Sequence, residues 1–328
     1  MQTVAVTGAS AGIGRAIAKA FAKAGARVGL VARSAAALDQ VKLEIEQTGG
    51  SALTLPCDVS DSTAVEAAAE RIEAEFGPID VWVNCAMVTV FSQVRDIQPD
   101  EYQRVTNVTY HGCVFGTMAA LKRMLPRQKG HIIQIGSALS YRSIPLQSAY
   151  CGAKHAMRGF TDSLRSELIH EKIPIEISMI QLPAFNTPQF SWGRNHMPSK
   201  PQPLPPIHDP ALAAQAVLWT VKNPQREVWV GLPTWKAILG HKLLPGFLDR
   251  YVASKAWQGQ FTGEKPEPNS PDNLCETIDP LHSEQGPFDD RTITKKPILW
   301  HVKNQNFWIN GTAFFVLIAV FLLGLILG

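Results

Sequence analysis

Short apolar runs alternate along this chain with longer stretches of helical periodicity, and this alternation restricts the fold more than any other feature. The pattern predicts strands at the N-terminus and at 26–32, 52–55, 79–84, 131–135, 175–182 and 227–230, and helices at 34–48, 62–76, 100–125 and 147–170. Strands that are apolar on both faces need cover on both sides, which helices provide in a parallel sheet. We therefore predict an α/β domain with a doubly wound parallel sheet over residues 1–233.

The rest of the chain differs from this domain in composition. We expect a helical extension at 234–258, interrupted at Pro245-Gly246, and then a polar linker at 259–306 that is rich in Pro, Gly, Asp and Glu. Residues 307–328 contain no charged residue. Because about 20 apolar residues suffice for a helix to cross a bilayer, this segment is predicted to be a single transmembrane helix.

The residues around the predicted anchor indicate its orientation. Lys295, Lys296 and Lys303 precede it, and Phe307 and Trp308 suit a membrane interface. We expect a membrane protein with a single-pass C-terminal anchor and its N-terminal domain on the cytoplasmic side. The alternative is a buried helix of a soluble core, which a position beyond a polar linker makes less favourable.

Charge and cysteine usage argue against two classes of function. The 328 residues include 31 Lys and Arg against 28 Asp and Glu, and the net charge of +3 is dispersed. Nucleic-acid binding is therefore not predicted. The five cysteines form no CxxC pair and have no histidine beside them at metal-ligand spacing, so we predict free thiols in a reducing compartment and no metal site.

A glycine-rich turn joins the first predicted strand to the first helix. Residues 7–14 read Thr-Gly-Ala-Ser-Ala-Gly-Ile-Gly. Glycines let the backbone approach a pyrophosphate, and the N–H groups at a helix N-terminus stabilise its negative charge. The turn therefore indicates a dinucleotide site, although its G-x3-G-x-G spacing differs from the G-x-G-x-x-G of many dehydrogenases.

The end of the second strand bears on the choice of cofactor. It reads Ala32-Arg33-Ser34. NAD-binding sheets usually carry an acidic residue roughly 20 residues past the glycines to bond the ribose 2′-hydroxyl, whereas an arginine accommodates a 2′-phosphate. Arg33 therefore favours NADP(H) over NAD(H); the alternative is a solvated surface arginine.

A tyrosine and a lysine share one face of a predicted helix. Tyr150 and Lys154 are four residues apart, and a nearby cation lowers the pKa of a phenol towards the range useful for proton transfer. Ser137 follows the fifth strand and can reach the same pocket. Tyr251 and Lys255 have the same spacing, but no strand-end serine precedes them, and we interpret that pair as structural.

With these residues together, the sequence resembles the short-chain dehydrogenase/reductase family, in its compact branch, over about residues 3–233. The matching segments are TGASAGIG at 7–14, CDVS at 57–60, Asn84, Asn107, Ser137, YCGAK at 150–154, and Leu182-Pro183 with Thr187-Pro188. The resemblance implies a Rossmann-fold catalytic domain. It also implies an NADP(H)-dependent oxidoreductase that interconverts a carbonyl and an alcohol on a small molecule, with homo-oligomers frequent in the family.

The resemblance implies roles for the matching residues. Tyr150 would exchange a proton with the substrate oxygen, Ser137 would bond that oxygen, and Lys154 would hold the nicotinamide ribose and keep Tyr150 acidic. Asn107 would position a water in the proton relay. Contacts to adenine and to the carboxamide would come from Asp58 and Thr187. The full set of indicated cofactor-binding residues is Gly8, Ser10, Gly12, Ile13, Gly14, Arg33, Ser34, Asp58, Val59, Asn84, Tyr150, Lys154 and Thr187.

Departures from the family pattern leave alternatives open. Asn84-Cys85-Ala86-Met87 stands where the family has Asn-Asn-Ala-Gly, so the turn after the fourth strand must be rebuilt, and Ala184 stands for a usual Gly. One alternative is a non-catalytic NADP-binding scaffold or sensor at a membrane, which would need the glycines but not an acid/base residue. An epimerase or dehydratase of the larger branch is disfavoured by the glycine spacing.

The substrate loop is irregular and rich in proline, at about residues 184–208. It carries Phe185, Phe190, Trp192 and Met197, and ligand pockets are mostly apolar. Together with the predicted anchor, these residues favour a lipophilic carbonyl or alcohol as substrate. The alternative is that they only pack the loop onto the core.

Overall fold

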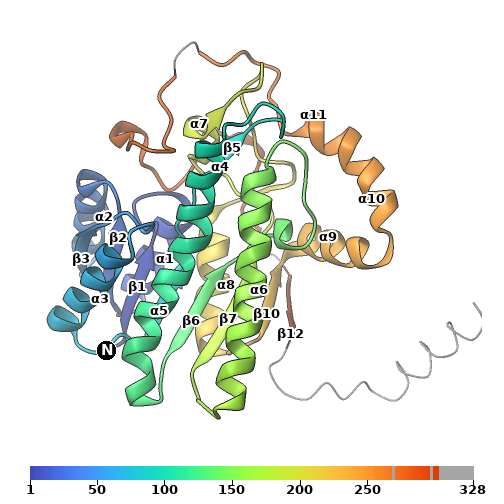
Figure 1. Cartoon of the computed structure of the whole chain (residues 1–328). Helices are drawn as coiled ribbons and strands as arrows, with labels where there is room; N and C mark the ends of the chain where they lie inside the picture. Colours follow the sequence, from blue (N-terminus) through green and yellow to red (C-terminus); the bar gives the residue numbers. More distant parts are fainter. Residues whose placement is uncertain (268–269, 296–297, 303–328) are drawn as a thin grey trace, which may run out of the picture.

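An eight-stranded sheet forms the centre of the molecule (Figure 1). The computed structural model describes residues 1–267, 270–295 and 298–302. The strands run in the order β12-β10-β7-β6-β4-β1-β2-β3, and all neighbours are parallel except β10 and β12. Their bounds are Thr3–Thr7 (β1), Arg27–Ala32 (β2), Ser51–Pro56 (β3), Val81–Asn84 (β4), His131–Ile135 (β6), Glu176–Gln181 (β7), Glu227–Val230 (β10) and Leu299–Val302 (β12). The predicted doubly wound parallel sheet is confirmed for its seven parallel strands.

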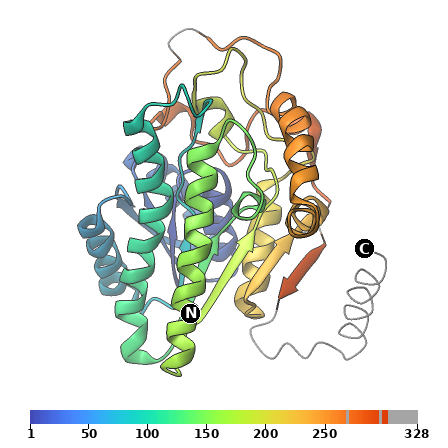
Figure 2. The same cartoon turned by 45° about the vertical axis from the view of Figure 1, so that its right-hand side comes forward.

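Helices cover both faces of the sheet (Figures 1 and 2). Along β1, Val4 and Val6 pack with one set of helices and Ala5 with the other, because successive side chains of a strand point to opposite faces. The first set is α1 (Gly12–Lys23), α2 (Ala35–Gln47) and α8 (Pro210–Lys222); the second is α3 (Ser62–Phe76), α4 (Pro99–Thr106), α5 (Gly112–Met124) and α6 (Ser148–His170). The buried strands therefore read as continuous apolar runs.

Local sequence accounts for the start of three of the longer helices. Ser34, predicted as a cap, accepts a hydrogen bond from the Ala37 amide at 3.1 Å, and Asp61 and Asp209 cap α3 and α8 in the same way. The helix predicted over 100–125 is divided by a π-helical turn at Asn107–His111 that separates α4 from α5. Helix α8 was not predicted.

Smaller elements surround the carboxyl ends of the parallel strands. Two short pairs form there: β5 (Val90–Phe91) with β8 (Arg194–Asn195), and β9 (Ile207–His208) with β11 (Thr292–Ile293). The helical extension consists of α9 (Gly231–Leu243), α10 (Pro245–Tyr251), a π turn (Val252–Ala256) and α11 (Trp257–Gly259). The substrate loop contains one short helix, α7 (Gln189–Trp192). The predicted interruption at Pro245 is where α10 begins.

The segment predicted as an exposed polar linker packs against the domain instead. Leu274 is 0 % exposed and Phe288 is 6 % exposed, and β12 extends the sheet beside β10. In Figure 1 the orange and red part of the chain crosses the top of the molecule, over the carboxyl ends of the strands. The prediction was wrong because single apolar residues, widely spaced among polar ones, leave no periodicity in the sequence.

The predicted anchor at 307–328 lies outside the described residues. Within the described ranges, no helix combines the length and apolar character that a membrane crossing requires.

Candidate active site

A cavity of about 650 Å³ lies at the carboxyl ends of the strands. Its walls come from the loops that follow β1, β2, β3, β4, β6 and β7, and from the facing side of α9 and α10. Ligands of open α/β sheets bind at this edge because every parallel strand delivers its following loop there. One end of the cavity adjoins the glycine-rich turn, and the other is lined by apolar side chains.

The glycine-rich turn has no room for side chains. Gly8 (φ 71°) and Gly12 (φ 53°) adopt left-handed backbone conformations. A Cβ atom at Gly14 would lie 2.1 Å from the Gly8 carbonyl oxygen. Helix α1 begins at Gly12, and the amides of a first helical turn have no intrahelical partner. Together with Ser10 and Ile13, which also line the cavity, the turn has the form of a phosphate cradle.

Arg33 lies at the cavity wall beyond the glycine-rich turn. Its guanidinium donates to the main-chain carbonyls of Asn273, Leu274 and Cys275. These residues belong to the segment at 270–289 that crosses the molecule, called the crossing segment below. These bonds use three of the five guanidinium N–H donors. Burial lowers the pKa of Arg33, and the neighbouring charge of Arg104 lowers it further. The arginine is therefore not the solvated surface residue of the alternative interpretation.

Asp58, Val59 and Ser34 complete this end of the cavity. Asp58 accepts hydrogen bonds from Ser60 and from the guanidinium of Arg104. Burial alone would raise the pKa of Asp58, but these hydrogen bonds outweigh it and lower the pKa. Asp58 is therefore a carboxylate at neutral pH, while the Ser34 hydroxyl donates to Asp279.

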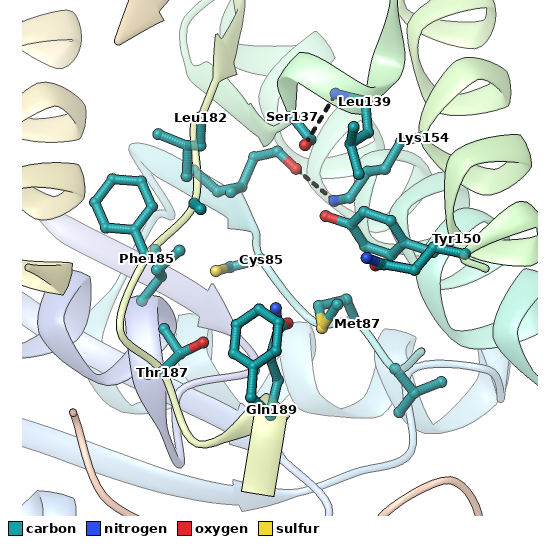
Figure 3. Close-up of a pocket in the computed structure, with 18 of the residues that line it drawn as sticks. Cys85, Met87, Ser137, Leu139, Tyr150, Lys154, Leu182, Phe185, Thr187 and Gln189 are labelled. Carbon is teal, nitrogen blue, oxygen red and sulfur yellow. Dashed lines mark hydrogen bonds between the residues drawn. The ribbon is translucent and has the colours of Figure 1, made fainter. Parts of the chain in front are cut away.

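Ser137, Tyr150 and Lys154 converge in the middle of the cavity (Figure 3). Ser137 follows β6, and its hydroxyl accepts a hydrogen bond from the Leu139 amide at 3.1 Å. Helix α6 brings Tyr150 and Lys154 to the same place from one face. The Lys154 ammonium donates to the Ile135 carbonyl at 2.6 Å and lies 5.6 Å from the centre of the Tyr150 ring.

Burial controls the protonation of this group. It raises the pKa of Tyr150 and outweighs the hydrogen bond with Ser137, which lowers it. Burial also lowers the pKa of Lys154. The sequence had led us to expect a cation-lowered tyrosine pKa; the ammonium is in place, but desolvation is the larger effect. Tyr150 therefore holds its proton at neutral pH.

Three predicted site residues, Gly14, Asn84 and Asn107, are not among the described residues that line the cavity. Asn84 is buried inside the sheet, where its side chain accepts from Trp82 and donates to Thr117 and Gln134. The Asn84 side chain thus ties β4 to β6 and α5, and its contact with the cofactor stays a prediction. Asn107 begins the π turn, which packs on α6, and its amide oxygen is 3.0 Å from His111 Nδ1.

The altered turn after β4 is held by Thr7. Its hydroxyl accepts hydrogen bonds from the amides of Cys85 (2.9 Å) and Ala86 (3.1 Å). Cys85 and Met87 both line the cavity, and Figure 3 shows the Met87 sulfur on the side of Tyr150. Burial raises the pKa of Cys85 to about 12, so the thiol is uncharged. The substitutions therefore make this wall more apolar while the turn keeps its attachment to β1.

The segment after β7 closes the central part of the cavity. Thr187 faces the glycine-rich turn, since a Cβ atom at Gly12 would lie 3.2 Å from Thr187 Cγ2. Phe185, Phe190 and Trp192 are buried and line the cavity, whereas Met197 is not among its described lining residues. Phe190 also packs on Phe91, with ring centres 5.9 Å apart. Three of the four apolar loop residues thus pack the loop onto the protein and also line the cavity.

Two sets of lining residues come from outside the catalytic domain. The sequence indicated the first set only in outline, since the helical extension could form an apolar wall of the pocket or lie on a membrane surface; α9 and α10 do line the cavity, with Phe247, Leu248 and Tyr251, so the tyrosine that was interpreted as structural belongs to this wall. The second set was missed, and it comprises Asn273, Thr277 and His282 of the crossing segment. The sequence carries no signal that we recognise for this second set.

A phosphate cradle beside a buried Ser-Tyr-Lys group, on the carboxyl edge of a parallel sheet, defines a dinucleotide-dependent oxidoreductase. The short chain dehydrogenase family profile matches residues 2–196, and the chain belongs to that family.

Known proteins that resemble the chain agree with this assignment. Human dehydrogenase/reductase SDR family member 7 is 38 % identical over 267 residues, covering 77 % of this chain and 75 % of that protein. The fatty acyl-CoA reductase of Acinetobacter baylyi is 34 % identical over 224 residues, covering 67 % and 73 %. The crystal structure of a metagenomic short-chain oxidoreductase in complex with NADP has a TM-score of 0.57 and 29 % identity, covering 68 % of this chain and 91 % of that one.

Proposed function

We propose that this protein is an NADP(H)-dependent oxidoreductase that interconverts a carbonyl and an alcohol on a lipophilic substrate at a membrane. The observation that carries the proposal is the position of Ser137, Tyr150 and Lys154. They lie in one cavity, between a phosphate cradle at one end and an apolar mouth at the other. A scaffold that only bound nucleotide would need the cradle but not this buried proton-transfer group.

The residues present fit a nicotinamide dinucleotide. Gly8, Gly12 and Gly14 leave open the space that side chains would fill. The first turn of α1 offers the amides that follow Gly12 for a diphosphate, since the Gly12 amide itself donates to the Ser283 carbonyl. Arg33 would hold the 2′-phosphate with the N–H donors that its three carbonyl bonds leave available, and Thr187 would hold the nicotinamide end. When bound, the cofactor supplies or accepts the hydride.

The chain itself supplies the proton. Tyr150 holds its proton at neutral pH, which is the state needed to donate to a carbonyl oxygen during reduction. The Ser137 hydroxyl hydrogen-bonds with the phenol and would hold the same substrate oxygen. The Lys154 ammonium favours the phenolate that remains after transfer, because an opposite charge nearby stabilises the charged form.

The mouth of the cavity supports a lipophilic substrate. Phe247 (63 % exposed) and Tyr251 (53 % exposed) line the cavity and also face solvent, with ring centres 6.4 Å apart. Leu243 and Leu244 are also exposed and continue this apolar corner (74 % and 60 %). Figure 2 shows the orange helices that carry it beside the red edge strand of the sheet. An extended hydrophobic group bound from this side would have apolar contacts from the mouth to the buried phenol.

The same corner supports attachment to a membrane. The same stretch of chain carries four exposed basic residues, as do helices that lie at an anionic bilayer surface: Lys236, Lys242, Arg250 and Lys255. The proposed anchor at 307–328 would keep this corner near the bilayer. We expect full-length protein in the membrane fraction and truncation after Lys303 to release it; full-length protein that is soluble without detergent would refute the anchor.

Cofactor preference is tested by comparing NADPH and NADH on the unaltered protein and on Arg33→Ala. If Arg33 holds the 2′-phosphate, kcat/KM for NADPH exceeds that for NADH, and Arg33→Ala lowers the NADPH value by about tenfold or more, as expected for a lost charge-assisted hydrogen bond. If Arg33 only holds the crossing segment, Arg33→Ala lowers kcat/KM by the same factor for NADPH and for NADH. Equal kcat/KM values in the unaltered protein would refute the preference.

Substrate class is tested with ketones and aldehydes of increasing chain length. We expect kcat/KM to rise with length, and Phe247→Ala to reduce it for long substrates only. Ile169→Ala is the matched control, because Ile169 is equally exposed (68 %) but lies on α6 away from the cavity lining. A flat or falling series would refute the lipophilic substrate.

A further inference from the structure

Residues 270–289 run along the outside of the cavity, on the side of the glycine-rich turn. Asn273, Thr277 and His282 line the cavity opposite Gly8, Gly12, Arg33 and Asp58. In Figure 1 this segment passes over the top of β1 and β2 and the ends of α1 and α2. It therefore covers the half of the site that would hold the adenosine and diphosphate of a dinucleotide.

The first end of the segment is anchored by apolar burial and main-chain bonds. Leu274 is fully buried in the core cluster that includes Val105 and Val108. Its carbonyl accepts from Arg104 Nε at 3.0 Å and from Arg33. The adjacent Asn273 amide donates to the Trp192 carbonyl, so the segment is also attached to the substrate loop.

The second end is anchored on Asn186, which is fully buried directly before Thr187. The Asn186 side chain accepts from the Phe288 amide at 3.2 Å and donates to Asp289 at 2.7 Å. Phe288 packs edge-on against Phe190, with ring centres 6.2 Å apart. Both ends of the segment are therefore fixed to the loop that closes the central cavity.

Between its ends the segment contacts the phosphate cradle itself. The Gly12 amide donates to the Ser283 carbonyl at 2.8 Å, and Arg15 donates to the His282 carbonyl at 3.1 Å. These contacts place the His282 side chain beside the first turn of α1. A cofactor lying on that turn would be enclosed between the cradle and residues 277–283.

His282 has an unused hydrogen-bonding atom at this position. Its imidazole bonds to the Ser10 carbonyl and packs on Trp192, with ring centres 4.9 Å apart. The Nδ1 atom is buried and has no hydrogen-bond partner among the described residues. Burial lowers the pKa of His282. The charge of Asp279 and the bond to Ser10 raise it, the charges of Arg15 and Arg33 lower it, and the net direction is downward. An anionic group between these side chains would raise the pKa of His282 again, and the Nδ1–H of the protonated ring would then donate to that group.

We propose that residues 270–289 form a cofactor clasp that closes over the adenosine and diphosphate half of the bound dinucleotide, with His282 as a phosphate-binding residue. This inference rests on the proposed dinucleotide cofactor. With the clasp closed, the cofactor cannot leave past the glycine-rich turn, whereas substrate and product use the mouth at α9 and α10. Opening of the clasp therefore limits the rate of cofactor exchange.

The test measures NADPH binding by fluorescence and NADPH release by stopped-flow displacement with excess NADP. Leu274→Ala and Phe288→Ala loosen the two anchored ends without removing a lining residue, and we expect release to accelerate about tenfold or more in each. His282→Ala should weaken NADPH binding about tenfold, the loss of one charge-assisted hydrogen bond. Leu281→Ala is the matched control, since Leu281 is exposed and lies outside the cavity lining, and should change neither quantity.

Proteolysis gives a second readout. Glu276 is exposed within the clasp, so a glutamyl endopeptidase should cut there slowly when NADPH is bound and faster without it. Release rates that match the unaltered protein in both anchor variants, or cleavage that NADPH leaves unchanged, would overturn the clasp while leaving the cofactor assignment intact. Failure of the unaltered protein to bind NADPH at all would overturn both.

Discussion

Replacing Gly14 by alanine is expected to destabilise the fold and the phosphate cradle together. The added Cβ would lie 2.1 Å from the oxygen and 2.7 Å from the carbon of the Gly8 carbonyl, and neither atom can rotate away because both belong to the backbone. Overpacking of this kind costs about 1–3 kcal/mol, and an overlap of this size lies at the upper end. The helical propensity gained by alanine offsets only about 1 kcal/mol. The expected net loss is about 2 kcal/mol.

The same substitution at Gly159 supplies the control. Gly159 is exposed in the middle of α6, and a Cβ there meets nothing within 4 Å. Gly159→Ala should therefore stabilise the protein by about 0.5–1 kcal/mol, which leaves a difference of about 3 kcal/mol between the two variants. Urea unfolding followed by circular dichroism measures this difference, and NADPH fluorescence measures the cradle, where Gly14→Ala should lose at least tenfold in affinity. If both variants are equally stable and bind NADPH equally well, the steric reasoning is wrong.

Two further predictions concern stability. Burial lowers the pKa of His131 from 6.5 to about 4, so the folded protein loses stability as the pH falls from about 6.5 to 4. Urea unfolding of His131→Gln should show up to about 3 kcal/mol less of this pH dependence. An unchanged dependence of the unfolding free energy on pH would contradict this prediction. Leu274→Ala should cost about 2–5 kcal/mol because the side chain is fully buried, whereas Leu281→Ala should change stability by less than about 0.5 kcal/mol. Equal stability of these two variants would show that residues 270–289 do not pack as described.

The sheet and the central site could be predicted from the sequence because both depend on local patterns. Continuous apolar runs identify buried strands. Ser137 follows the carboxyl end of β6 and Tyr150 lies in the first turn of the next helix, so both belong to the same edge of the parallel sheet. The glycine-rich turn likewise carries its own steric signature at Gly8, Gly12 and Gly14. For these features, spacing along the chain is enough to place the residues in space.

The features that were missed depend on tertiary contacts of isolated residues. Leu274 and Phe288 are single apolar residues in a polar segment, so average composition indicated a linker although each is buried. Asn84 was predicted to contact the cofactor, and spacing gave no sign that its side chain also donates to Thr117 of α5 and Gln134 of β6. Tyr251 had a recognisable spacing, but only the turn at Pro245 brings its ring to the mouth of the cavity.

The most direct test of the proposed chemistry is turnover of Tyr150→Phe with NADPH and a carbonyl substrate. This change removes the proton donor and retains the ring, so we predict a loss in kcat on the order of 10²-fold or more, while fluorescence shows that NADPH still binds. Tyr102→Phe is the control, since Tyr102 lies on α4 outside the cavity lining of the described residues. Turnover of Tyr150→Phe within a few-fold of the unaltered protein would contradict the account.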